Sequence, residues 1–124
     1  MPERIHMSHE EFLAQMKARA LEVILQAQRG DIGLLLAVRE VHGILWGLAE
    51  LEKTPKSADL LLLKGVSSEC DEWPLGSERL FWAPASLQAK DEQIDRYTAK
   101  VRDEVFQAFV RISDDLNGYN KLPG

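Results

Sequence analysis

Residues 29–51 read RGDIGLLLAVREVHGILWGLAEL, and the apolar pattern in this stretch decides the fold class. Its apolar residues recur at alternating spacings of four and three, which is the period of one face of an α-helix. That stripe consists of Leu34, Val38, Val41, Leu45 and Leu48. Gly30 is the residue type that ends helices in the left-handed conformation, and Asp31 is a preferred N-cap. The stretch therefore predicts the end of one helix at Gly30 and a second, largely buried helix from Asp31 onwards.

The segment before this joint carries the signals of a capped helix. Ser8 is followed three residues later by Glu11, which makes a capping box, and Met7 and Phe12 are placed as a hydrophobic staple. The apolar stripe that follows consists of Phe12, Met16, Ala20, Val23 and Ala27. Because the joint at Gly30 is so short, we expect the two helices to pack as an antiparallel hairpin.

The middle of the chain carries two short apolar runs after a predicted loop at 53–57. The first run, 59–66, contains four consecutive leucines, and the second, 79–83, lies beyond a turn-rich stretch at 71–77. Short apolar runs on either side of turn residues predict a β-hairpin with a long connection, with Trp82 of the second run in the core. The helix propensity of leucine supports an all-helical alternative.

The last third of the sequence predicts a short helical piece at 84–88 and a long helix at about 91–113. Pro84 suits the first turn of a helix. The apolar stripe of the long helix consists of Ile94, Tyr97, Val101, Val105, Ala108 and Ile112. Asp114 and Asp115 are unfavourable at a helix C-terminus, so we expect the helix to end near them.

These elements predict a mainly α (α+β) fold. Three long amphipathic helices pack as a bundle, with a small β-hairpin between the second and the last, and an all-α bundle is the alternative. The length of 124 residues fits a single compact domain over 1–124. Within it, 1–7 is predicted to be an N-terminal lead-in and 117–124 a C-terminal tail.

Composition excludes some partners and compartments. The net charge of -5 and the scattered lysines and arginines argue against nucleic-acid binding, which needs a concentrated basic face. Arg39, Glu40 and His42 interrupt the apolar run at 32–51, and each central charge would cost about 2.5–3.5 kcal/mol in a bilayer, so we expect no membrane span. Cys70 is the only cysteine, which excludes an intrachain disulfide and suits a reducing compartment. We therefore expect a cytoplasmic protein.

The second helix carries four candidate pocket residues, Glu40, His42, Gly43 and Gly47. His42 could act as an acid–base group oriented by Glu40. Residues two apart on a helix point about 200° away from each other, however, which weakens that pairing and favours Glu40 in solvent with His42 at a boundary. Gly43 and Gly47 share one face, where internal packing, a homodimer contact or a ligand would each explain the absence of side chains.

The segment after the leucine run is a candidate interaction loop. Its predicted binding residues are Glu69, Asp71, Glu72, Trp73 and Pro74. An aromatic anchor rimmed by charge is typical of binding hot spots. In the alternative, Trp73 and Leu75 fold back over the core while the acidic side chains face water.

Motifs for covalent, nucleotide and metal chemistry are missing from the sequence. It contains neither a Gly-x-Gly-x-x-Gly nor a Gly-x-Ser-x-Gly motif and no His-Glu-x-x-His, and it lacks the pair of Glu-x-x-His motifs that a di-iron bundle needs. We therefore predict no catalytic residues, no metal and no cofactor. The expected function is a non-enzymatic protein–protein interaction module, such as an adaptor, a regulator or an immunity-type protein. The alternatives are a small-molecule-binding protein or enzyme with its pocket near His42, and a homo-oligomeric scaffold that associates through the second helix.

Overall fold

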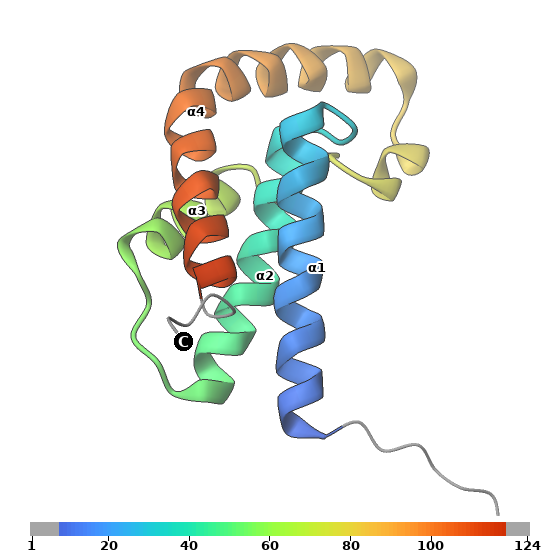
Figure 1. The fold of residues 1–124 in the computed structure, drawn as a ribbon. Coiled ribbons are helices and arrows are strands. Elements are labelled where there is room, and N and C mark those ends of the chain that lie inside the picture. Colours follow the sequence, from blue (N-terminus) through green and yellow to red (C-terminus); the bar gives the residue numbers. More distant parts are fainter. Residues whose placement is uncertain (1–7, 119–124) are drawn as a thin grey trace, which may run out of the picture.

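A computed structural model describes residues 8–118, and this part of the chain forms helices without a strand (Figure 1). In chain order the elements are α1 (His9–Arg29), α2 (Leu34–Glu52), α3 (Ala58–Glu69), the 3-10 helix η1 (Ser77–Phe81) and α4 (Pro84–Gly118). The predicted lead-in at 1–7 and the tail from residue 119 onwards lie outside the described residues. None of the described helices is both long enough and apolar enough to cross a membrane.

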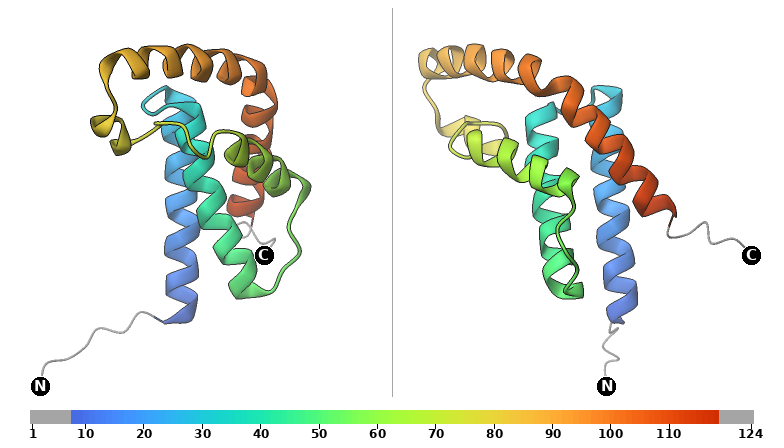
Figure 2. Two further views of the ribbon diagram at one scale, coloured as in Figure 1. Left: turned by 180° about the vertical axis from the view of Figure 1, so that it is seen from behind. Right: turned by 90° about the vertical axis from the view of Figure 1, so that its left-hand side faces the viewer.

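The helices α1 and α2 lie side by side and antiparallel, as the short joint predicts (Figures 1 and 2). The N-terminal half of α4 crosses over the end of this hairpin where α1 meets α2, and its C-terminal half turns down along the bundle. That C-terminal half contacts α1, α2 and α3. The long α4 thereby joins the hairpin to α3 on one side of the molecule.

The start of α1 and its end at Gly30 confirm the predicted capping signals. The Ser8 hydroxyl accepts a hydrogen bond from the backbone N–H of Glu11 at 3.1 Å. Gly30 has φ +79°, the left-handed conformation that residues with a Cβ rarely adopt. Met7 lies outside the described residues, so the predicted staple with Phe12 stays a prediction.

The predicted N-cap of α2 is wrong, because Asp31 completes the end of α1 instead. The N–H of Gly30 donates to Ala27 O at 3.1 Å and the N–H of Asp31 donates to Gln26 O at 2.8 Å. These two bonds are those of a Schellman motif. The chain needs two further residues to change direction, so Gly33 becomes the N-cap of α2.

The predicted β-hairpin is also wrong, and the all-helical alternative is correct. The leucine run forms α3, whose Ser57 N-cap accepts a hydrogen bond from the N–H of Leu60 at 3.1 Å. Leu60, Leu63 and Val66 recur at helical spacing and are buried. Strand pairing would bury alternate residues, whereas this spacing places the buried residues on one face of a helix. The second apolar run, 79–83, does not form a strand either, and most of it belongs to η1.

Two further corrections concern α4, which is one continuous helix over Pro84–Gly118. Residues 88–91 contain neither glycine nor proline, so nothing local breaks the helix where two separate pieces are predicted. Asp114 and Asp115 do not end it, because both are exposed and water screens their interaction with the helix dipole. Residues 117–118 are therefore helical rather than part of a tail.

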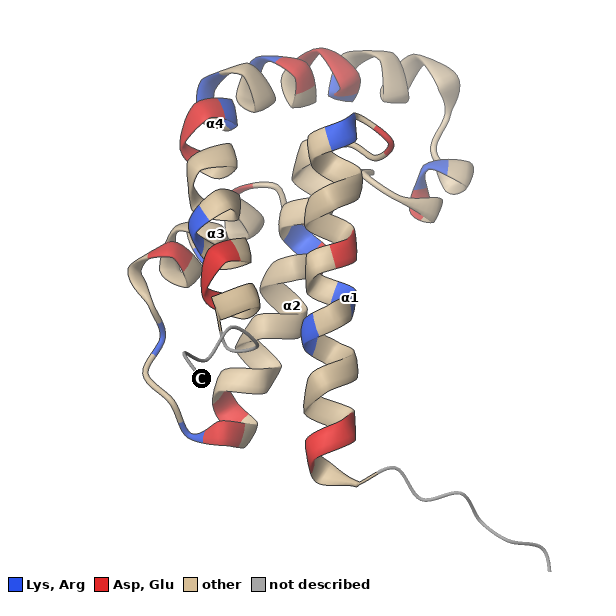
Figure 3. Cartoon of the chain, in the orientation of Figure 1, with Lys and Arg blue, Asp and Glu red and all other residues tan. Residues whose placement is uncertain are grey.

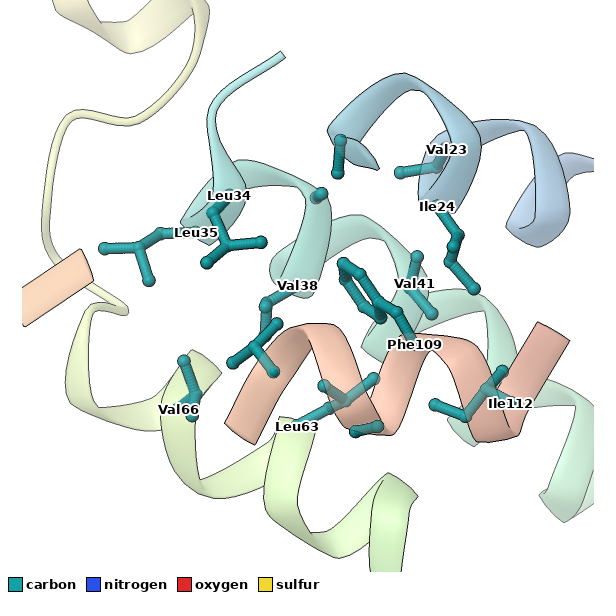
Figure 4. Close-up of a cluster of buried hydrophobic side chains, with 14 of the residues drawn as sticks. Val23, Ile24, Leu34, Leu35, Val38, Val41, Leu63, Val66, Phe109 and Ile112 are labelled. Atoms are coloured by element: carbon teal, nitrogen blue, oxygen red, sulfur yellow. The ribbon is translucent and has the colours of Figure 1, made fainter. Parts of the chain in front are cut away.

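The core lies where the C-terminal halves of α1 and α4 meet α2 and α3 (Figure 4). Phe109 of α4 is completely buried at its centre. The buried residues of α1 begin only at Ala20, and those of α4 only at Val105. The N-terminal half of α1 therefore extends beyond the core, whereas Ile94, Tyr97 and Val101 in the N-terminal half of α4 are partly buried and pack against it.

Candidate functional site

Arg39 connects the middle of α2 to the segment between α3 and η1. Its Nη2 donates to the backbone carbonyls of Cys70 at 3.0 Å, Asp71 at 3.3 Å and Trp73 at 3.1 Å. Its Nη1 donates to the Glu78 carboxylate at 3.0 Å. A guanidinium is suited to this role because its donors form a rigid planar fork. One cation thus satisfies three carbonyls of a segment that has little regular hydrogen bonding of its own.

The role of Arg39 is not predicted from the sequence, where it counts only as a charge that interrupts the apolar run at 32–51. The side chain is only 25% exposed. Its position in the sequence could have indicated this role. Arg39 comes one residue after Val38 and four after Leu35, and both of those residues belong to the buried surface of α2. A charged group on such a surface requires partners.

The segment after α3 folds back onto the bundle, as the second interpretation of that loop expects. Trp73 packs edge-on against Tyr97 of α4, with ring centroids 5.6 Å apart and an interplanar angle of 87°. Pro74 is almost completely buried and Leu75 packs against the core. The acidic residues Glu69, Asp71 and Glu72 are exposed. Whether this acidic rim contacts a partner stays a prediction.

Glu78 holds the start of η1 in place. Its carboxylate accepts hydrogen bonds from the Gly76 N–H and from Arg39. Partial desolvation would raise the pKa of Glu78, but these donors outweigh it and hold the pKa below its ordinary value. A Cβ on Gly76 would lie 2.9 Å from Glu78 Oε1, so a side chain there would require the Glu78 carboxylate to shift.

Arg79 fixes η1 to the first turns of α4. Its guanidinium makes two hydrogen bonds to Asp91, of 2.7 and 2.9 Å, and a third of 3.1 Å to the carbonyl of Pro74. The hydrogen bonds from Arg79 lower the pKa of the Asp91 carboxyl. Bidentate pairing of this kind restricts the orientation of both partners.

The next two residues of η1, Leu80 and Phe81, are the most exposed large apolar side chains among the described residues. Leu80 is 84% exposed and Phe81 is 89% exposed. Trp82, predicted to lie in the core, is only partly buried and does not belong to the core cluster. η1 lies at the periphery of the molecule, to the side of the α1–α2 hairpin near its joint (Figure 2). We call Leu80 and Phe81 the exposed apolar pair.

The structure separates Glu40 and His42, the polar candidates of α2. Glu40 faces α1, where its carboxylate lies 3.9 Å from Arg19. The His42 ring instead packs against Trp46, with centroids 5.5 Å apart. Its Nε2 is buried and has no hydrogen-bond partner among the described residues. The geometry therefore does not support Glu40 as the group that orients His42.

The surroundings of His42 favour its neutral form. Desolvation by burial is the larger cause that lowers its pKa, and the positive charge of Lys64 adds to it. The ammonium groups of Lys56 and Lys64 lie 4.9 and 4.7 Å from the Trp46 ring centroid. A proton on His42 would thus add a cation where lysines already gather and where Nε2 finds no acceptor.

Gly43 and Gly47 lie on an exposed face of α2. A Cβ built on either residue would meet nothing within 4 Å. Close packing inside the fold, one of the three explanations of these glycines, is therefore not supported by the described residues. Contact with a second copy of the chain and contact with a ligand stay predictions.

The remaining titratable groups of residues 8–118 are not gathered into one cluster. Cys70 is completely buried, and burial is the main cause that raises the pKa of its thiol. No group of three or more His, Cys, Asp or Glu side chains in residues 8–118 is arranged to hold a metal ion. Acidic and basic residues are interspersed along the described helices (Figure 3).

Comparison with known proteins yields no family model, no curated protein and no solved structure that matches this chain.

Proposed function

We propose that this chain is a protein–protein interaction module that docks through the exposed apolar pair of η1. The observation that carries the proposal is the exposure of Leu80 and Phe81, 84% and 89%, on an element held by ion pairs. Single exposed apolar residues are common on protein surfaces, whereas aromatic and aliphatic anchors that project together are typical of binding hot spots.

The attachment of η1 supports this role. Glu78 of η1 is bound by Arg39 of α2, and Arg79 of η1 binds Asp91 of α4. An anchor that is already ordered in the free protein loses less conformational entropy when it binds. The ion pairs therefore favour docking even though they do not face the partner.

The acidic residues predicted as binding residues complement the anchor. Glu69, Asp71 and Glu72 are exposed in the segment that Arg39 holds against α2. Charges near an interface mainly steer the encounter and select the partner. The expected partner thus has an apolar cavity for Leu80 and Phe81 and a basic surface nearby.

Site-specific photo-crosslinking in the source cell tests the proposal. A benzophenone amino acid at position 81 should give a discrete adduct with one protein, and the same group at Leu61 or Val110 should not. Those control side chains are 51% and 50% exposed on other helices. Purified partner should then bind the wild-type chain but not the Leu80→Ala/Phe81→Ala variant.

Two further measurements test whether loss of binding reflects the exposed apolar pair itself. Because both side chains are exposed, the double variant should change the free energy of unfolding by no more than about 0.5 kcal/mol per site. Sedimentation with phosphatidylcholine vesicles checks whether the pair enters lipid instead. Equal adducts from positions 61, 81 and 110, or vesicle binding that requires Leu80 and Phe81, would overturn the proposal.

A second candidate function is self-association through α2. The open space over Gly43 and Gly47 favours it, because helix backbones approach most closely where side chains are absent. Light scattering over a range of protein concentrations tests this alternative. A strictly monomeric mass at the highest concentration would contradict it.

A further inference from the structure

The N-terminal half of α1 has an apolar face that the fold does not cover completely. Phe12 is 40% exposed, and Leu13 and Met16 are only partly buried. None of these three belongs to the core cluster, to which α1 contributes only from Val23 onwards. Figure 1 shows this half of α1 extending past the C-terminal end of α4.

Two adjoining hollows lie beside this face. The larger, of about 360 Å³, is lined by Leu13 and Leu21 of α1 and by Leu116 at the end of α4. The smaller, of about 170 Å³, reaches the leucines near the end of α2. Lys17, Glu52 and Leu116 line both, so we treat the two hollows as one surface and call it the α1–α4 groove.

The shape of the groove fits a helix better than a small ligand. Its lining along α1 runs from Glu10 to Leu21, which spans about 17 Å at 1.5 Å per residue. Small-molecule sites usually contain a few polar groups that converge on the ligand. The charged residues of α1 and α2 that line this groove are Glu10, Lys17 and Glu52. The two carboxylates among them are exposed. A trough about three turns long, with leucines along it and charged residues beside them, suits helix-in-groove recognition.

The charges along the groove indicate which helix would bind. Glu10, Glu52 and Asp115 are exposed carboxylates that line it. Lys17 is the cation that lines both hollows, and its Nζ lies 3.5 Å from Glu52. The carboxylates exceed the cations that line the groove, so its potential complements a basic partner.

We propose that the α1–α4 groove binds an amphipathic helix of another protein, one that carries lysine or arginine beside its apolar face. This inference goes beyond docking through Leu80 and Phe81, because the groove lies along the N-terminal half of α1 and η1 lies at the far end of the hairpin (Figure 2). Two separate surfaces would allow the chain to hold two proteins at once, as an adaptor does.

Fluorescence anisotropy with designed peptides tests the inference on the full-length chain. The probe is a labelled peptide of about 14 residues, roughly four helical turns, with leucines on one face and lysines beside them. One control peptide replaces each lysine by glutamate, and another has the same composition with its leucines spread around the helix. The lysine peptide should bind at least about tenfold more tightly than either control, with a Kd that rises with salt.

Two tryptophan variants locate the binding surface. Ala18 is an exposed alanine that lines the groove, and Ala18→Trp should fill it and weaken binding of the lysine peptide by about tenfold or more. Ala99 is an exposed alanine of α4, and Ala99→Trp is the matched control that should bind like the wild type. The Leu80→Ala/Phe81→Ala variant should also bind normally, which separates this inference from the proposed function.

Several outcomes would overturn the inference. Equal affinity for the lysine and glutamate peptides would show that charge does not select the partner, and undiminished binding to Ala18→Trp would place the peptide elsewhere. If light scattering shows a dimer that Ala18→Trp makes monomeric, a second copy of the chain covers the groove. If the lysine peptide binds only after Leu122→Glu, the chain's own C-terminal residues compete for it.

Discussion

At the scale of single residues, Arg39 has the largest effect on the candidate site. It reaches four partners in the segment from Cys70 to Glu78, although those partners lie 31 to 39 positions away in the sequence. An arginine can bind several carbonyls and a carboxylate at once because its donors diverge in one plane. The order of η1, and with it the presentation of Leu80 and Phe81, depends on this side chain together with the Arg79–Asp91 pair.

Replacement of Arg39 should therefore destabilise the protein and loosen η1. We expect Arg39→Met to lower the free energy of unfolding by about 2–3 kcal/mol, since several hydrogen bonds to a charged group are lost and the Glu78 carboxylate loses its cation. Arg39→Lys should recover only part of this loss. Urea unfolding measures the change, and hydrogen exchange of the η1 amides reports the loosening.

The neighbouring variant Glu40→Gln is the control for Arg39. Glu40 makes only a long, exposed ion pair of 3.9 Å with Arg19, so its loss should cost less than about 1 kcal/mol. An Arg39→Met protein as stable as Glu40→Gln would show that the segment is held by its apolar contacts alone.

His42 should make stability depend on pH. Its pKa in the folded protein lies below the ordinary value of 6.5, so between the two values the unfolded chain binds more protons. The free energy of unfolding then rises with pH in that window. With respect to His42, the free energy of unfolding should be highest above pH 6.5. It should fall as the pH decreases from 6.5 through the lowered pKa of His42 in the folded state.

Unfolding by urea at a series of pH values measures this dependence. His42→Leu should flatten the decline that begins below pH 6.5, whatever it does to stability at neutral pH. His9→Gln, at the exposed start of α1, is the control and should retain it. Identical pH profiles for the wild type and His42→Leu would contradict the structural account of this histidine.

At the scale of elements, α2 carries glycines that its own packing does not require. A Cβ would meet nothing within 4 Å at Gly43 or Gly47, and each glycine in a helix interior costs about 0.5–1 kcal/mol relative to alanine. Gly43→Ala and Gly47→Ala should therefore each raise the free energy of unfolding by about that amount. Thermal and urea unfolding of the isolated chain check the gain.

The glycine in α3 provides a control for any contact made by the open face of α2. Gly65 also has open space around a built Cβ, so Gly65→Ala should stabilise the protein similarly. If Gly43→Ala and Gly47→Ala change the mass measured by light scattering and Gly65→Ala does not, self-association through α2 gains support. A loss of stability at either α2 position would instead mean that the face is filled.

Elements also differ in how far their sequence predicts them. The two ends of α1 could be predicted because Ser8 and Gly30 act through hydrogen bonds to residues within four positions. The helix α3, which contains the leucine run, is only 12 residues long. A short apolar run is equally consistent with a helix and with a buried strand. Its helical identity depends on packing of Leu60 and Leu63 against the bundle, which is tertiary information.

At the scale of the whole molecule, one core supports two surfaces at separate places. The core cluster joins all four α-helices around Phe109 (Figure 4) and leaves the N-terminal half of α1 outside it. That half of α1 carries the α1–α4 groove, and the Arg79–Asp91 pair joins η1 to the first turns of α4. Because the variants proposed for each surface avoid the core, their effects on binding should be separable from effects on folding.

The sequence by itself determined that the chain is mainly helical, where α1 begins and ends, and which residues are available for chemistry. These properties depend on hydrophobic period and on capping contacts between near neighbours. Tertiary structure alone decided that Arg39 is a structural cation, that Trp73 turns inward, and that Leu80 and Phe81 face solvent. The reason is physical: burial of a side chain depends on which distant segment lies over it, and no local pattern encodes that neighbour.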